Sequence, residues 1–190
     1  MADMMKVLLS AQAAAAVWGE GALLSFSGEE TLIHLGATAQ QQDALRTIQR
    51  AARRLESSGI KRVSLAGEGW DLERRYAFAQ GFYAAKGQRE VDFGEQSAAQ
   101  ARELEALVKA TRWVREVTNG CPEEIYPMSL AESALLLIRG LGGDQVTARI
   151  TAGEALREAG HIGIWSVGRG SEREPVLLEL DYNPTGDRNA

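Results

Sequence analysis

The side chains with the clearest capacity for chemistry are basic ones that cluster within a short stretch of the chain. They are Arg46, Arg50, Arg53, Arg54, Lys61 and Arg62. Guanidinium and ammonium groups bind phosphates, so this cluster could hold a nucleic-acid backbone. The acidic total of the chain and the lack of aromatic residues among the arginines argue against that use, because single strands are held partly by stacking on aromatic rings. The pattern favours a solvated helix face or a subunit contact through Arg46, Arg50, Arg53 and Arg54.

Nucleophiles and metal ligands are sparse. A two-metal hydrolase site needs roughly four to six oxygen or nitrogen ligands around ions about 3.5 to 4 Å apart. The chain has two histidines, His34 in a strand-like stretch and His161 after a glycine, and it has no lysine after Lys109. Its single cysteine, Cys121, lies between a glycine and a proline. A lone histidine or cysteine is more often structural than catalytic, so we predict no catalytic residue and no metal ligand in this chain.

A short glycine-rich segment, Gly67-Glu68-Gly69, follows a strand-like stretch and precedes a helical one. Backbone N–H groups at such a point could hold an anion. Glu68 would repel that anion, and the string matches neither the dinucleotide-binding nor the P-loop pattern. We therefore predict a tight turn. The four tryptophans are spread along the chain, which favours anchors in the core or between domains over a ligand cage. They are Trp18, Trp70, Trp113 and Trp165.

The composition is that of a packed protein, with 45% hydrophobic residues among 190. A net charge of −5 argues against a chain that mainly neutralises a phosphate backbone. One cysteine excludes an internal disulfide, and no apolar run approaches the roughly 18 residues of a membrane span. The first residues lack the basic segment of a signal peptide. We expect a cytoplasmic protein with no membrane partner.

The first half of the chain predicts strands and helices in alternation. Three short strands come first, at residues 6–10, 22–26 and 31–35. A helix over residues 42–57 follows, because its apolar residues recur at helical spacing and a glycine comes just after it. The next elements are a strand over 61–66, a helix capped by Asp71 that ends near Ala84, and a strand over 89–93. This order predicts an α/β domain over residues 1–96.

A long amphipathic helix over residues 97–119 is predicted to link this domain to a second one. Beyond it, Ser129 with Glu132 and Thr151 with Glu154 have the spacing of capping boxes at two helix starts. Strands are predicted over 145–150, 162–167 and 175–182. These elements are too few to close a sheet and cover it, so residues 120–190 predict the incomplete start of an α/β domain with uncovered apolar strands.

Several strings of the sequence resemble the leucyl aminopeptidase family, and within it the peptidase B group. The longest is GIWSVGRGSEREPVLLELDYNPTGD, residues 163–187. Shorter matching strings lie at residues 5–6, 18–20, 48–53, 59–61, 67–71, 113–115, 151–154 and 156–158. The family's metal-binding strings, Gly-Lys-Gly followed by Asp-(Thr/Ser)-Gly-Gly and the later Asn-Thr-Asp-Ala-Glu-Gly-Arg, do not occur in the 190 residues.

This resemblance implies the N-terminal portion of a cytosolic enzyme that releases N-terminal amino acids from peptides with two divalent metals, manganese or zinc. It implies a mixed-sheet α/β sandwich of the leucyl aminopeptidase N-terminal type, a linking helix and the start of the catalytic domain. It also implies a homohexamer in which the N-terminal domain serves assembly and access, and a peptide substrate bound by the missing part of the catalytic domain. We expect the 190-residue chain alone to be inactive and to hold no metal.

A second hypothesis from another class stays open. The chain could be a free-standing, non-catalytic module that binds a partner, or binds nucleic acid weakly, and that shares ancestry with the same domain. Arg46, Arg50, Arg53 and Arg54 are the residues that would carry such a contact.

Overall fold

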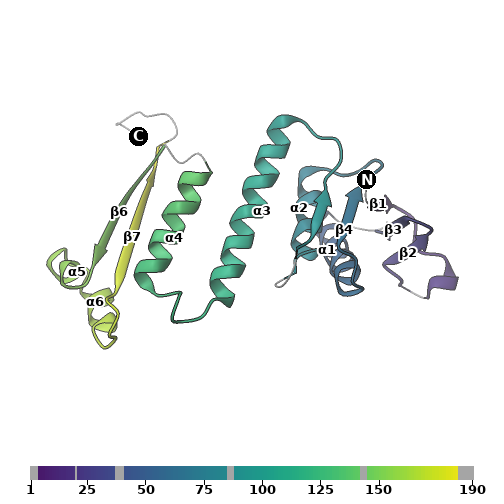
Figure 1. The fold of residues 1–190 in the computed structure, drawn as a ribbon. Helices are drawn as coiled ribbons and strands as arrows, with labels where there is room; N and C mark the ends of the chain where they lie inside the picture. The colour runs from purple at the N-terminus through teal and green to yellow at the C-terminus, as the bar shows by residue number, and fades with distance from the viewer. Residues whose placement is uncertain (1–3, 20, 37–40, 85–87, 142–144, 184–190) are drawn as a thin grey trace. The chain divides into compact units, whose positions relative to one another are not determined.

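A computed structural model of the chain describes residues 4–19, 21–36, 41–84, 88–141 and 145–183. The chain divides into two units, Met1–Thr111 and Arg112–Ala190. The division falls inside the long helix α3, Ala98–Asn119, which the sequence predicts as a link (Figure 1).

The N-terminal unit is built on a five-stranded sheet with the order β2-β3-β1-β4-β5. Its strands are β1 (Met5–Ser10), β2 (Leu24–Ser27), β3 (Glu30–His34), β4 (Arg62–Leu65) and β5 (Glu90–Asp92). β2 pairs antiparallel with β3, and the other neighbours pair in parallel. A short 3-10 helix, η1 (Ala16–Trp18), precedes β2. This mixed sheet confirms the predicted fold class.

Two helices complete the core of this unit. They are α1 (Gln41–Ser57) and α2 (Leu72–Gly81), and they pack against each other and on the sheet. Ile48 and Leu55 of α1 are fully buried together with Phe78 of α2 and Val7 of β1. Burying one such side chain contributes roughly 1.5 to 3 kcal/mol. The apolar stripe that predicts α1 therefore does form the core-facing side of the helix.

Helix α2 is held by close backbone packing and by one buried charge. A methyl group added at Gly81 would overlap the carbonyl oxygen of Gln49, so α1 and α2 approach closely only because position 81 has no side chain. Arg75 is 8% exposed, and its guanidinium donates to the carbonyl oxygens of Trp70, Phe93 and Glu95. This side chain ties α2 to the chain that leads from β5 toward α3.

The C-terminal unit contains an antiparallel pair of strands with short helices between them. Its elements are α4 (Pro127–Gly140), β6 (Val146–Ala152), α5 (Glu154–Glu158), α6 (Ile162–Gly168) and β7 (Val176–Tyr182). β6 and β7 pair along their whole length, and Arg149 and Glu179, opposite each other in this register, form an ion pair. Trp113 donates to Ser133, which joins the end of α3 to α4.

Three predictions for this unit are wrong. Residues 162–167 form α6 instead of a strand. Trp165 of this helix donates to Glu154 of α5, and its ring contacts Arg157 and Arg169. This local packing overrides the β-branched composition. Thr151 does not cap α5, since β6 continues through it and Gly153 is the N-cap.

Ser129 is likewise not the N-cap of α4. Pro127 sets the helix start two residues earlier, so that Tyr126 becomes the N-cap. The Tyr126 N–H donates to Ser129 Oγ over 2.9 Å, and that hydroxyl lies 2.7 Å from the carbonyl oxygen of Glu124, to which it donates. The Ser129 hydroxyl thus bonds to backbone groups that precede the helix, and it does not act as the N-cap.

The two units differ in how much apolar surface they bury. Among the described residues of the C-terminal unit, Ala131 and Leu156 are the buried hydrophobic ones. Leu136 is 69% exposed and Val167 is 86% exposed. The described part of this unit therefore has little core of its own.

Candidate anion-binding groove

An open groove of about 890 Å³ lies in the N-terminal unit between α1 and β2. One wall is the exposed side of α1, with Arg50, Arg53 and Arg54. Leu24 and Phe26 of β2 line the opposite side, and Trp18 of η1 lies near Phe26. The groove therefore combines cationic and apolar surface.

The sheet register explains how these side chains come to face each other. Leu24 pairs with Ile33 and Phe26 pairs with Thr31, and residues that pair directly lie on the same face of a sheet. Ile33 belongs to the core that α1 covers. The side chains of Leu24 and Phe26 therefore point to the sheet face on which α1 packs.

The structure brings together three of the four arginines that the sequence identifies as a possible contact. Arg53 and Arg54 lie three and four residues after Arg50 along the helix, and all three side chains are exposed. Arg46 lines a different pocket, next to Tyr76 of α2 and Leu107 of α3. The predicted cluster is thus divided between two surfaces.

None of the three groove arginines makes a side-chain hydrogen bond or ion pair with a described residue. Elsewhere in the unit arginines are engaged: Arg62 pairs with Glu90, and Arg89 pairs with Glu56. Within the part of the chain that the structure describes, no carboxylate lines the groove. The described residues therefore leave the positive charge of the groove open to a ligand.

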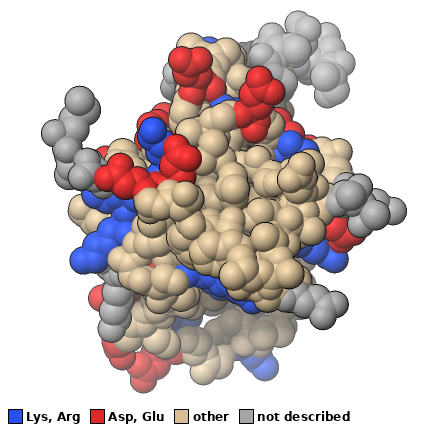
Figure 2. Space-filling model, turned by 90° about the vertical axis from the view of Figure 1, so that its right-hand side faces the viewer, with Lys and Arg blue, Asp and Glu red and all other residues tan. Residues whose placement is uncertain are grey.

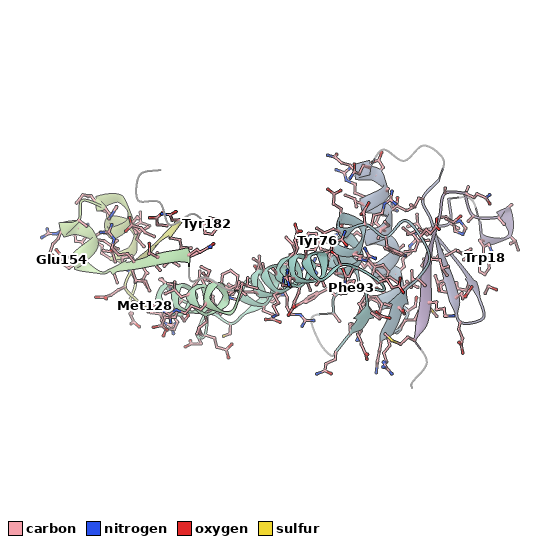
Figure 3. All side chains as sticks on the ribbon, turned by 90° about the horizontal axis from the view of Figure 1, so that it is seen from above. Trp18, Tyr76, Phe93, Met128, Glu154 and Tyr182 are labelled. Atoms are coloured by element: carbon pink, nitrogen blue, oxygen red, sulfur yellow. The ribbon has the colours of Figure 1, made fainter. Side chains whose placement is uncertain are left out.

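Aromatic residues are absent from the sequence around the arginines, but the fold supplies them from a distant part of the chain. Trp18 and Phe26 have ring centroids 6.3 Å apart and are 45% and 40% exposed. Trp18 is labelled at the outer side of the N-terminal unit in Figure 3. Figure 2 views the side of the molecule on which β2 lies, where basic side chains border a broad uncharged surface. Trp18 is therefore no core anchor, whereas Trp70, buried against Phe78, is one.

The two histidines and the single cysteine lie outside the groove. The two ring nitrogens of His34 lie 2.8 Å from Ser25 Oγ and 3.0 Å from the carbonyl oxygen of Gln12. His161 lies at the N-cap of α6, and Cys121 is exposed in a turn.

The turn at Gly67 and Gly69 is filled by the protein itself. Both glycines have positive φ, and Arg74 donates to the carbonyl oxygen of Gly69 over 2.7 Å. Asp71 accepts the N–H of Arg74 over 2.8 Å and caps α2 as predicted. This is the tight strand-to-helix turn that the sequence predicts.

A metal centre is not formed by the residues that the structure describes. Among them, no three histidine, cysteine, aspartate or glutamate side chains come together as a metal site requires. Within the same residues, no helix is both long and apolar enough to cross a bilayer.

Comparison with known families places both units. Residues 112–190 match the sequence model of the cytosol aminopeptidase family, catalytic domain, and residues 6–97 match a family model described as a peptidase. Residues 112–190 therefore belong to the cytosol aminopeptidase family. The predicted family is confirmed.

Solved structures show the same fold. The bottromycin maturation enzyme BotP in complex with Mn is similar with a TM-score of 0.67 and 22% identity, over 97% of this chain and 46% of that one. Leucyl aminopeptidase from Trypanosoma brucei in complex with actinonin is similar with a TM-score of 0.64 and 18% identity, over 95% of this chain and 45% of that one. A tomato leucine aminopeptidase mutant is similar with a TM-score of 0.56 and 18% identity, over 87% of this chain and 38% of that one. The chain spans less than half of the length of these structures.

Proposed function

We propose that this chain is the N-terminal portion of a metallo-aminopeptidase that releases N-terminal amino acids from peptides. The observation that supports this most strongly is the match of residues 112–190 to the catalytic domain of the cytosol aminopeptidase family. The fold likeness to two aminopeptidases and to BotP adds to it, since it extends over both units. The peptidase B group remains the branch that the sequence strings favour.

In this proposal the catalytic metals are two divalent ions, manganese or zinc, held by residues outside the described part of this chain. One similar structure contains manganese, which agrees with that choice for the family. The described residues do not fit a metal centre, because they bring no ligand cluster together. No step of the reaction is therefore assigned to them.

The role proposed for the chain itself is in assembly and access to the active site. The N-terminal unit has a closed core of its own, so it can act as a rigid body that contacts neighbouring subunits. We propose a cytoplasmic homohexamer for the longer protein. The C-terminal unit would contribute the β6–β7 pair to a larger catalytic domain that covers its exposed apolar side chains.

Hydrolysis of leucine p-nitroanilide with added Mn²⁺ tests this function. The 190-residue chain should show none, and the product of its whole reading frame should hydrolyse the substrate and lose activity on chelation. Activity in the isolated chain that disappears when one of its own residues is replaced would overturn the proposal, as would an inactive, metal-loaded whole product. Light scattering of that product tests the hexamer separately.

The alternative of a non-catalytic interaction module is favoured by one observation, the groove whose arginines have no partner among the described residues. A groove of this kind is compatible with a domain of an aminopeptidase as well. Its ligand can therefore be considered independently of the proposed reaction.

A further inference from the structure

The groove adjoins a free edge of the sheet. β2 is the end strand, and it has β3 on one side. The N–H of His34 donates to the carbonyl oxygen of Leu23, so Leu23 and His34 form a hydrogen-bonded pair. Such pairs alternate along an antiparallel ladder. The backbone groups of Leu24 and Phe26 therefore point away from β3, and no hydrogen bond joins them to another described residue.

An exposed edge of this kind accepts an additional strand, because its N–H and C=O groups match those of an extended chain. Side chains of an added strand alternate between the two faces of the sheet. Every second side chain would then lie on the face that carries Leu24 and Phe26, which is the face on which α1 packs. There it would meet the arginine wall of the groove.

The spacing of the charges fits this arrangement. Arg50 and Arg54 are four residues apart on α1, which is about 6 Å along a helix axis. Alternate residues of a strand are about 6.6 Å apart. Acidic side chains at alternate positions would therefore face successive arginines, while apolar parts of the same segment would lie against Trp18 and Phe26.

We propose that the groove between α1 and the free edge of β2 binds an extended peptide segment with acidic side chains at alternate positions, which adds a sixth strand next to β2. The peptide class is chosen over a nucleic acid because a phosphate backbone has no N–H groups to pair with the edge carbonyls. A second copy of the same edge is disfavoured, because it would bring two sets of unpaired arginines together. This inference does not depend on the proposed aminopeptidase activity.

Fluorescence anisotropy with a dye-labelled ten-residue peptide of alternating Glu and Val tests the proposal on the 190-residue chain. The acidic peptide should bind, and its Lys and Val counterpart should not. The double variant Arg50→Glu with Arg54→Glu should weaken binding at least about tenfold. Arg46→Glu is the matched control, because it reverses a charge on the same helix outside the groove, and it should change binding less than about threefold.

Two further probes separate strand addition from simple attraction of anions. One peptide carries N-methyl groups on its odd residues and the other on its even residues. Only one of the two should lose binding, because only alternate N–H groups of a strand face its neighbour. Equal binding of both methylated peptides and the parent would overturn the proposal. So would tighter binding of a ten-residue oligothymidylate, or equal losses from the Arg46 variant and the double variant.

Discussion

Arg75 is a buried guanidinium whose partners are all backbone carbonyls, and its replacement by methionine tests how much it stabilises the N-terminal unit. Its Nε lies 2.9 Å from the Phe93 oxygen and one terminal nitrogen lies 2.7 Å from the Glu95 oxygen. A third bond goes to the Trp70 oxygen. Methionine keeps much of the side-chain length but offers no donor. The variant Arg75→Met would leave these three oxygens without that partner.

The magnitude follows from two opposing effects. Each hydrogen bond from a charged donor contributes roughly 1.5 to 3 kcal/mol, and an unsatisfied buried acceptor costs about 1 to 3 kcal/mol. The losses are not additive, because the carbonyls of residues 93–95 can turn toward water and because removing a buried charge relieves its desolvation. We expect Arg75→Met to lower the free energy of unfolding by about 2 to 4 kcal/mol, which is roughly 10 to 20 °C in melting temperature.

Hydrogen exchange of the α2 amides and urea unfolding followed by circular dichroism measure the effect. Arg74→Met is the matched control, since Arg74 is the neighbouring residue on α2 and is partly exposed, with a bond to Gly69 and a weak ion pair to Asp71. Its loss should stay within about 1 kcal/mol. Equal losses for the two variants would refute the reasoning that the buried carbonyls decide the outcome.

Three further changes have expected outcomes. Gly81→Ala should cost about 1 to 3 kcal/mol by urea unfolding, since the new methyl group would meet the Gln49 carbonyl. The hydrogen bond and charge of Arg62 lower the pKa of Glu90 below its usual value, so this ion pair stabilises the folded state at higher pH. The difference in unfolding free energy between the native chain and Glu90→Gln should therefore shrink as pH falls through that lowered pKa. Val167→Lys should reduce self-association in light scattering, because Val167 is among the most exposed apolar side chains.

Controls for these changes lie in the same chain. Gly140→Ala adds a methyl group that meets nothing within 4 Å, so a loss as large as that of Gly81→Ala would contradict the packing argument. A stability gap for Glu90→Gln that widens in acid would contradict the sign of its pKa shift. Glu158→Lys places a lysine at an exposed polar position of the same unit. If it reduced association as much as Val167→Lys, net charge and not apolar surface would be the cause.

The sequence correctly predicts the elements that bury one face, because such burial leaves apolar residues at regular spacing. Helix α1 buries Ala44, Ile48, Ala52 and Leu55, which recur at helical spacing, so periodicity alone places it. Asp71 caps α2 because its short carboxylate reaches a free N–H of the first turn. The order of strands and helices then predicts the α/β class.

The elements that the sequence predicts wrongly depend on contacts made elsewhere. Residues 162–168 contain β-branched residues and a tryptophan that suit a strand, yet Trp165 contacts Glu154 and two arginines in a helix. The start of α4 moves because Pro127 can begin a helix and Ser129 finds an acceptor behind it. Local spacing cannot reveal these partners.

The sequence indicates the arginine wall of the groove but not its aromatic wall. Arg50, Arg53 and Arg54 form a recognisable run, but Trp18 and Phe26 reach them only after β2 has paired with β3. Arg46 shares a side of α1 with Arg50 and Arg53, because these residues are four and seven positions apart. It is separated from them along the helix axis, where it lies one turn nearer the start of α1 and lines the pocket with Tyr76. A helical projection of residues 41–57 places all four arginines within one face, so it does not indicate that separation.

The acidic total of the chain was the main sequence argument against an anionic ligand, and the structure shows why it does not decide the matter. A net charge of −5 describes the whole molecule, whereas charges further apart than a Debye length of about 8 Å are largely screened at physiological salt. A ligand in the groove is influenced chiefly by Arg50, Arg53 and Arg54, which described acidic side chains do not neutralise. Binding there should therefore weaken as salt rises while remaining insensitive to charge reversals on the far side of the unit.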